Sequence, residues 1–169
     1  MTKFLALAIV MLAFTVSTFA QVSATATATA NIVTPIAIAN AANMDFGNLA
    51  VNASPGTVIL SAAAVPTRTP SGGVTLMTGG TVTSARFTVT GLAGATYAIT
   101  LPADGVVSLT GPGAPMAANS FVSSPTVAAG GVLTGGTEIL YVGATLSVAG
   151  GQTTGTYTSA AFTVTVNYN

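Results

Sequence analysis

The sequence predicts an all-β protein, folded as a sandwich of two antiparallel sheets. Apolar and polar residues alternate with a period of two along many short segments after residue 20, and this period places successive side chains on opposite faces of a strand. Glycine and proline interrupt these segments, and no convincing helical period follows residue 20. Several short alternating strands with frequent turns are typical of a β-sandwich. A closed barrel is the competing architecture.

The first twenty residues predict a secretory signal peptide. Lys3 provides a cationic start, an apolar-leaning run extends from Phe4 to Val16, and small residues precede a cleavage site after Ala20. The apolar run is shorter than the roughly 20 residues that span a membrane. A retained N-terminal anchor is the alternative. Cleavage would leave a mature chain of Gln21–Asn169 without a membrane span.

The predicted mature chain carries very little charge. It has two arginines and three carboxylates, so its formal net charge is −1. These residues are Arg68, Arg86, Asp45, Asp104 and Glu138. This balance argues against binding to nucleic acid, which requires a basic patch. It also argues against a polybasic membrane-surface contact. A surface with so little like-charge repulsion suits a protein whose natural state is assembled.

The residues that most enzymes use are missing. The chain has no His and no Cys, and its single Lys lies in the predicted signal peptide. Neither the usual bases that activate a nucleophile nor the usual zinc ligands are therefore present. No motif links the three carboxylates, and the tripeptide Asp45–Gly47 lacks the surroundings of the kinase motif that it matches. We predict a non-enzymatic protein without catalytic residues, metal or cofactor.

The stretch Gln21–Ile38, "QVSATATATANIVTPIAI", alternates for longer than a strand of ordinary length, which is about 3–10 residues. Thr34-Pro35 is a natural break, because proline lacks the N–H that a sheet requires. We therefore divide the mature chain into an N-terminal arm, residues 21–33, and a β-sandwich domain, residues 34–169. The residues Ile36-Ala37-Ile38 are expected in the domain's own first strand. The candidate inward face of the arm comprises Val22, Ala24, Ala26, Ala28, Ala30 and Ile32.

Two interpretations of the arm stay open. It is a donor strand for a neighbouring molecule, or a flexible leader between signal and domain. Ala-Thr repeats are low in complexity, and alanine is a poor β-former whose burial contributes little.

The remaining alternating segments predict the strands of the domain. The longer ones cover residues 87–91, 96–102, 106–111, 137–148 and 156–168, and the shorter ones cover 57–62, 73–77 and 120–124. The "GLAGA" connection predicts a hairpin between the first two. The last segment is expected to turn a core face inward, formed by Phe162, Val164, Val166 and Tyr168. Residues 81–90 and 156–165 match at eight of ten positions, either as analogous strands of two sheets or through β-rich composition.

Several segments occur in an order that resembles a known family. They are "ATATANIVTPIAI", "MDFGNL", "GGTVTSARFTVTG", "GATYAITLP", "LYVGATLSV" and the terminal "GTYTSAAFTVTVNYN". This layout is similar to the bacterial secreted family catalogued as domain of unknown function 4402. It is also similar to the spore coat protein U and fimbrial subunit families, whose members are incomplete immunoglobulin-like sandwiches. A chaperone, and then a neighbouring subunit, supplies the missing strand in those proteins. The present chain departs from many pilus subunits, because it has no disulfide and offers alanine where donor strands present bulky residues.

The resemblance implies an immunoglobulin-like antiparallel β-sandwich that a donor strand completes. The first functional hypothesis is a secreted structural subunit of a bacterial surface filament, coat or matrix. Such a subunit would pass through the periplasm to the cell surface or the medium. Its partners would be copies of itself or neighbouring subunits, with a periplasmic chaperone as a further candidate.

The alternative hypothesis is a self-contained adhesion module that recognises a glycan or a protein through its loops. The candidate loops are "VPTRTPSGG", residues 65–73, and "GPGAPMAANS", residues 111–120.

Overall fold

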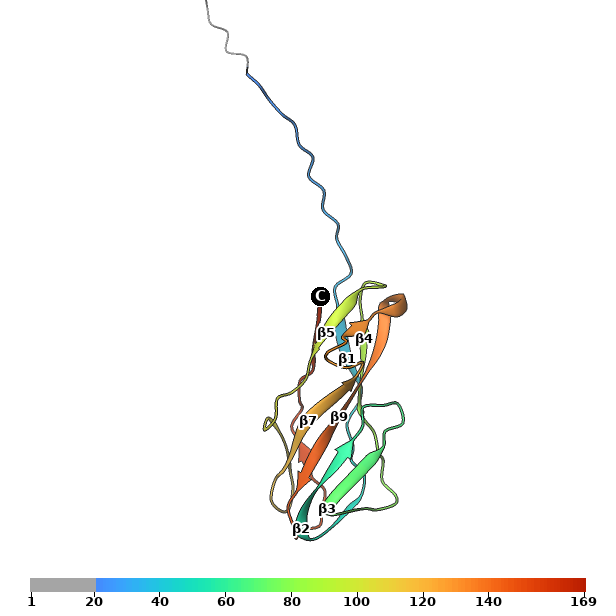
Figure 1. Cartoon of the computed structure of the whole chain (residues 1–169), viewed down its shortest axis with the longest axis vertical. Coiled ribbons are helices and arrows are strands. Elements are labelled where there is room, and N and C mark those ends of the chain that lie inside the picture. The colour runs from blue at the N-terminus through green and yellow to red at the C-terminus, as the bar shows by residue number, and fades with distance from the viewer. Residues whose placement is uncertain (1–20) are drawn as a thin grey trace, which may run out of the picture. The chain divides into compact units, whose positions relative to one another are not determined.

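Eleven strands and one 3-10 turn make up the part of the chain that the computed structural model describes, residues 21–169 (Figure 1). The predicted signal peptide lies outside the described residues. The strands are β1 (Ala37–Ala42), β2 (Leu49–Leu60), β3 (Arg68–Leu76), β4 (Ala85–Thr90), β5 (Thr96–Thr100), β6 (Val107–Thr110), β7 (Met116–Ser124), β8 (Gly131–Val132), β9 (Thr137–Val148), β10 (Thr158–Ser159) and β11 (Thr165–Tyr168). The 3-10 turn is η1 (Thr134–Gly136). Among residues 21–169 there is no helix with the length and hydropathy that a membrane crossing requires.

The strands form two antiparallel sheets, and β9 is the central strand of the larger one. One edge of β9 pairs first with β4 and then with β2, while its other edge pairs with β7. The strand β1 extends the sheet beyond β4, β3 extends it beyond β2, and β6 and β10 follow β7. The smaller sheet has the order β11-β5-β8. The predicted all-β sandwich is confirmed.

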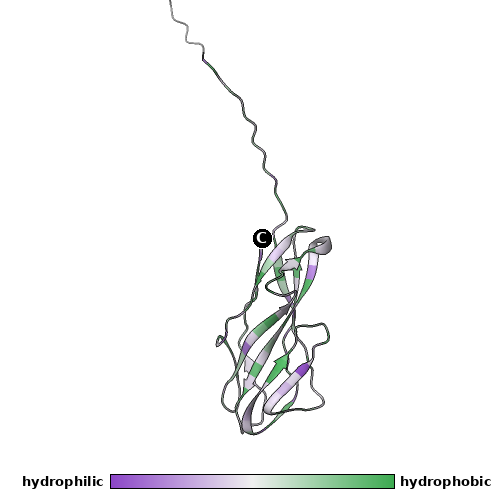
Figure 2. Cartoon of the chain, in the orientation of Figure 1, coloured by the Kyte–Doolittle hydropathy of each residue, from purple (hydrophilic) through white to green (hydrophobic). Residues whose placement is uncertain are grey.

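The interior contains two hydrophobic clusters, and β9 supplies both. Leu140 and Val142 lie in the cluster that faces the smaller sheet, together with Tyr97 and Ile99 of β5. Further along β9, Leu146 lies in the second cluster, against β2 and β7. Figure 2 shows the alternation of hydrophobic and hydrophilic residues along the strands, with few strongly hydrophilic positions. Period-two patterning therefore places the core as expected.

Gly143 marks the point where β9 leaves β4 and begins to pair with β2. It is buried, and a Cβ atom at this position would collide with the backbone carbonyl of Leu60 at the end of β2. Only glycine lets the two backbones approach so closely.

Two predicted loops are partly strands. The strand β3 begins at Arg68 and therefore includes most of the "VPTRTPSGG" segment, while β7 begins at Met116 within "GPGAPMAANS". Prolines and glycines usually indicate turns, but β3 has an open edge that tolerates Pro70. The β2–β3 ladder also contains a register shift between Val51 and Gly56. The prediction of loops is wrong for these residues.

The predicted hairpin between β4 and β5 is also wrong. The strand β4 pairs with β1 and β9, whereas β5 belongs to the smaller sheet, so the connecting residues 91–95 cross from one sheet to the other. Alternation and turn residues indicate that a reversal occurs, but they do not say whether the strand returns beside its neighbour or across the core.

The first strand begins near the predicted position. Ala37 and Ile38 open β1 and pair with Thr90 and Val89, while Ile36 lies just before the strand and packs against the core. The two similar segments, residues 81–90 and 156–165, present the same pairs to one cluster: Phe87 with Val89, and Phe162 with Val164. Residues 85–89 lie in β4, whereas the matching residues 160–164 belong to no strand, so the two segments contribute to one core without being analogous strands.

Truncation of β9 on its inner face should be costly. Leu140 has no exposed surface, so Leu140→Ala is expected to lower the free energy of unfolding by about 2–5 kcal/mol. Ile139, the adjacent residue on the outer face, is 39% exposed, and Ile139→Ala should cost about 1 kcal/mol or less. Urea unfolding of both variants measures the difference. Equal losses would contradict the assignment of the inner face.

Candidate functional site

Residues 21–33, the predicted arm, form no strand, and every one of them is exposed. Val22 is 93% exposed and Ile32 is 97% exposed. The candidate inward face of the arm, Val22, Ala24, Ala26, Ala28, Ala30 and Ile32, therefore faces solvent in the single chain. Alternation here does not produce a strand, because a strand requires a neighbour with which to share its hydrogen bonds.

The C-terminal segment places its apolar residues against the core. Val164 and Val166 are each 7% exposed, and Phe162 packs on Phe121 with their ring centroids 5.5 Å apart. The half-buried Tyr168 packs against the same cluster as Val164 and Val166.

This segment also changes sheets. β10 pairs with β6 of the larger sheet, and β11 pairs with β5 of the smaller one. Residues 160–164, which lie between them, belong to no strand.

Tyr168 joins three parts of the domain. Its hydroxyl donates a hydrogen bond to the carbonyl of Thr34 at 2.8 Å and accepts one from the backbone N–H of Leu92 at 2.6 Å. Gly91 leaves room for this hydroxyl, because a Cβ atom there would collide with it. The end of β11, the start of the domain and the β4–β5 connection are thereby held together at one end of the sandwich.

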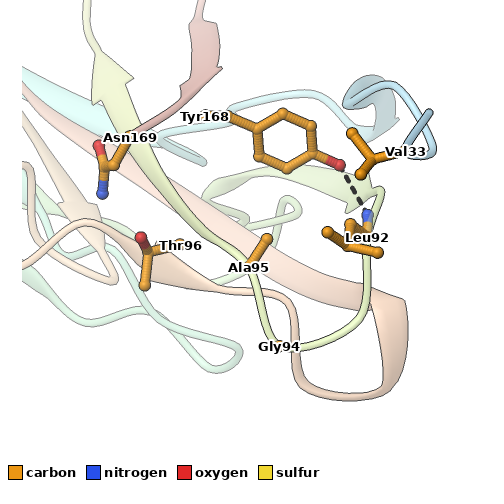
Figure 3. Close-up of a pocket in the computed structure, with 7 residues that line it drawn as sticks. All are labelled: Val33, Leu92, Gly94, Ala95, Thr96, Tyr168 and Asn169. Atoms are coloured by element: carbon orange, nitrogen blue, oxygen red, sulfur yellow. Dashed lines mark hydrogen bonds between the residues drawn. The ribbon is translucent and has the colours of Figure 1, made fainter. Parts of the chain in front are cut away.

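Two open hollows border the C-terminal segment. The first, of about 450 Å³, lies beside the Tyr168 ring, and Figure 3 shows Val33 next to the hydrogen bond between Tyr168 and Leu92. Its lining consists of Val33, Leu92, Gly94, Ala95, Thr96, Tyr168 and Asn169. The second, of about 390 Å³, separates residues 160–163 from the β5–β6 connection, where Val106 is 70% exposed. Neither lining contains a charged side chain, so neither hollow offers acid–base chemistry.

The three carboxylates lie apart and each accepts a backbone N–H. Asp45 accepts from Gly47 at 2.8 Å, Asp104 accepts from Ser120 at 2.6 Å, and Glu138 accepts from Val132 at 2.8 Å. Within residues 21–169, no group of three acidic side chains is placed to hold a metal ion. The carboxylates of this part of the chain therefore stabilise turns and connections.

Arg68 holds the segment "MDFGNL" in place, a role that sequence reasoning missed. Its guanidinium donates to the carbonyls of Phe46, Asn48 and Met77 at 2.9, 3.1 and 3.3 Å. Phe46 is 7% exposed in the core, and Gly47 adopts a left-handed φ of +66° beside the guanidinium. The "DFG" string is thus a structural turn, and no local signal in the sequence connects it with Arg68, which lies 21 positions after Gly47.

Tyr97 carries a buried hydroxyl with no hydrogen-bond partner among the described residues. The side chain has no exposed surface. Burial and the nearby Glu138 carboxylate raise the pKa of Tyr97 well above its ordinary value, so its phenol stays neutral in the folded protein. Glu138 accepts a hydrogen bond from the N–H of Val132 through Oε2 at 2.8 Å.

The two tyrosines provide a matched pair of substitutions. Tyr97→Phe removes an unpartnered hydroxyl and should raise the free energy of unfolding by about 1 kcal/mol. Tyr168→Phe removes two hydrogen bonds and should lower it by about 1–2 kcal/mol. Urea unfolding at pH 7 measures both, and opposite signs are the expected result.

The raised pKa of Tyr97 also predicts a dependence on pH. The wild-type protein should lose stability as the pH rises above about 10, where the unfolded tyrosine ionises and the folded one does not. The Tyr97→Phe variant should lose less over the same range. Parallel curves for the two proteins would contradict the burial of a neutral phenol.

Arg68→Lys should destabilise the domain although it keeps the charge. An ammonium group is a point donor and does not reproduce the planar fork that reaches three carbonyls. We expect a loss of about 1–3 kcal/mol by urea unfolding. Arg86→Lys, at an exposed position of β4, is the control and should change stability by less than about 0.5 kcal/mol.

One family model matches the chain from the residue before β1 to the end of β11. The family model for the Domain of unknown function (DUF4402) matches residues 36–168 and leaves the arm outside its limits. No curated protein and no solved structure matches the chain. The chain belongs to the family described as Domain of unknown function (DUF4402).

Proposed function

We propose that this protein is a non-enzymatic structural subunit of a bacterial surface filament, coat or matrix. In this proposal it is secreted through the periplasm after cleavage following Ala20. Copies then assemble when the arm of one adds as a strand to a sheet of its neighbour. The observation that carries the proposal is the arm, which alternates like a strand but forms no ladder with any other described residue of its chain.

The chemistry of the arm supports addition to a sheet. Residues 21–32 contain no charge, no proline and no glycine, so nothing in them prevents a continuous ladder. Strand addition obtains its affinity from backbone hydrogen bonds and its fit from alternate side chains. Val22 and Ile32, almost fully exposed at the two ends of the alternating face, are the residues with most apolar surface to bury.

The domain supports assembly through its low charge and its closed interior. Twenty hydrophobic residues form the two buried clusters, and none of them belongs to the arm. The domain therefore builds its core without the arm, which leaves the arm for a neighbour. This differs from the incomplete sandwiches that the fimbrial resemblance implies, whose interior lacks a strand.

The alternative adhesion function has less support. The two segments expected to form recognition loops lie largely in β3 and β7. Neither hollow beside the C-terminal segment offers an aromatic platform beyond the rings of Tyr168 and Phe162.

Deletion of the arm tests the proposed function. The mature protein, residues 21–169, should form concentration-dependent oligomers on size exclusion with light scattering, and a variant that lacks residues 21–32 should stay monomeric. A control that replaces residues 21–32 with a Gly-Ser segment of equal length should also stay monomeric. Thermal unfolding of the two variants should match that of the unassembled mature protein.

Oligomers that persist unchanged in the deletion variant would refute the proposed role of the arm. Oligomers formed by the Gly-Ser control, but not by the deletion, would identify the arm as a spacer without strand character.

A further inference from the structure

We infer that the arm of one copy pairs with the outer edge of residues 160–168 in a second copy. The outer edge is the side of this segment that faces away from β5. The inference rests on the proposed function and adds the acceptor site to it. It is argued from a comparison of the sheet edges, because some edges carry features that block pairing with another strand and others do not.

Residues 160–164 have an unusually open backbone. They belong to no strand, and no backbone hydrogen bond joins them to another described residue. The side chain of Val164 is nevertheless buried, so the segment is held against the core without a partner for its backbone. Unpaired N–H and C=O groups on an extended segment form a template for another chain.

The open edge continues along β11, where alternate backbone groups point away from β5. Asn169 donates its N–H to the carbonyl of Thr96, in line with the pairs Thr165–Thr100 to Tyr168–Tyr97. Hydrogen-bonded and non-hydrogen-bonded pairs alternate in an antiparallel ladder. The backbone groups of Val166 and Tyr168 therefore point away from β5. The whole span of residues 160–168 gives an edge of nine residues, about 30 Å long.

The other edges carry features that discourage pairing. Pro70 and the left-handed Gly72 interrupt β3, and the β2–β3 ladder shifts register. The strand β1 has a register shift between Asn40 and Ala42 and follows Pro35. The strands β8 and β10 have two residues each. Residues 160–168 contain no proline, no glycine and no charge, and β11 has no register shift, so this edge is less protected than those of β1, β3, β8 and β10.

The arm matches this edge in length and size. Residues 22–32 would reach about 36 Å as a strand, which is enough to cover nine acceptor residues. The core beside the edge is already filled, because Val164 and Val166 are each 7% exposed. Beside Val164 and Val166 an added strand would find no groove to fill, so alanine suits its inward face there better than a bulky side chain. The alanines of the arm are thus the residues expected for pairing at a closed edge.

A second copy is the donor that the geometry favours. Tyr168 binds the carbonyl of Thr34 at the end of β11. The chain's own arm would have to reverse within Val33 and Thr34 to run back along this edge, immediately before Pro35, whose φ is fixed. The arm of another molecule has no such constraint.

Cysteine cross-linking tests the inference directly, because the natural chain has no cysteine. Thr163→Cys places a thiol at an exposed position of the acceptor edge, and Thr75→Cys places a matched thiol at an exposed position of β3. Each variant is mixed with a size-tagged arm variant that carries one thiol, introduced by Thr25→Cys, Thr27→Cys or Thr29→Cys, and the mixture is oxidised. At least one arm position should give about tenfold more mixed disulfide with Thr163→Cys than with Thr75→Cys.

Equal or greater cross-linking to Thr75→Cys would overturn the assignment of the acceptor edge. A chain that carries both Thr27→Cys and Thr163→Cys provides the second measurement. If it closes an internal disulfide at a concentration where the mature protein forms oligomers, the donor is the chain's own arm and the inference is wrong.

The outcomes separate the inference from the proposed function. If deletion of the arm abolishes oligomers while Thr163→Cys remains unlinked, the proposed function stands and the acceptor edge is wrong. If oligomers survive the deletion, both fail. Substitution of Ala26→Pro and Thr27→Pro adds a check on strand character, because only one of two adjacent N–H groups faces the acceptor. Assembly should be lost with one proline variant and retained with the other; equal behaviour would contradict pairing at an edge.

Discussion

The pairing of β9 on both of its edges is the interaction on which the rest of the domain depends. It joins β4 and β2 on one side to β7 on the other, and its inner face supplies residues to both hydrophobic clusters. Gly143 allows this arrangement, because the backbone of β2 occupies the space where a side chain would lie. One strand of twelve residues thereby carries the long-range order of the larger sheet.

The strands that the sequence predicts best are those with one face against the core and the other face towards solvent. In β4, β5 and β9 one face is buried and the other is more exposed, so hydrophobic and hydroxyl residues alternate clearly. The strands β2 and β3 are predicted only in part, since Pro55, Pro70 and the Gly72–Gly73 pair lie inside them. Residues that usually mark turns are tolerated there because the ladder is irregular and one edge is open.

Other features could not be read from local pattern. The partner of a strand depends on contacts far away in the sequence, so local pattern predicts a hairpin where residues 91–95 cross from sheet to sheet. The contacts of Arg68 with three carbonyls depend on the same long-range order, and nothing in a single sequence distinguishes this arginine from Arg86. The arm presents the reverse case. Its pattern predicts a strand, but a strand exists only with a partner, and the described part of the single chain provides none.

The hydrogen bond between Tyr168 and Thr34 has a mechanical consequence for a chain of linked copies. In the arrangement that we infer, tension would enter each domain through its arm at Val33 and leave through the edge that holds the next arm, at residues 160–168. Tyr168 connects these two points directly. The load path would therefore cross one end of the sandwich rather than its core. The load on the hydrophobic clusters would then be reduced for as long as this hydrogen bond holds.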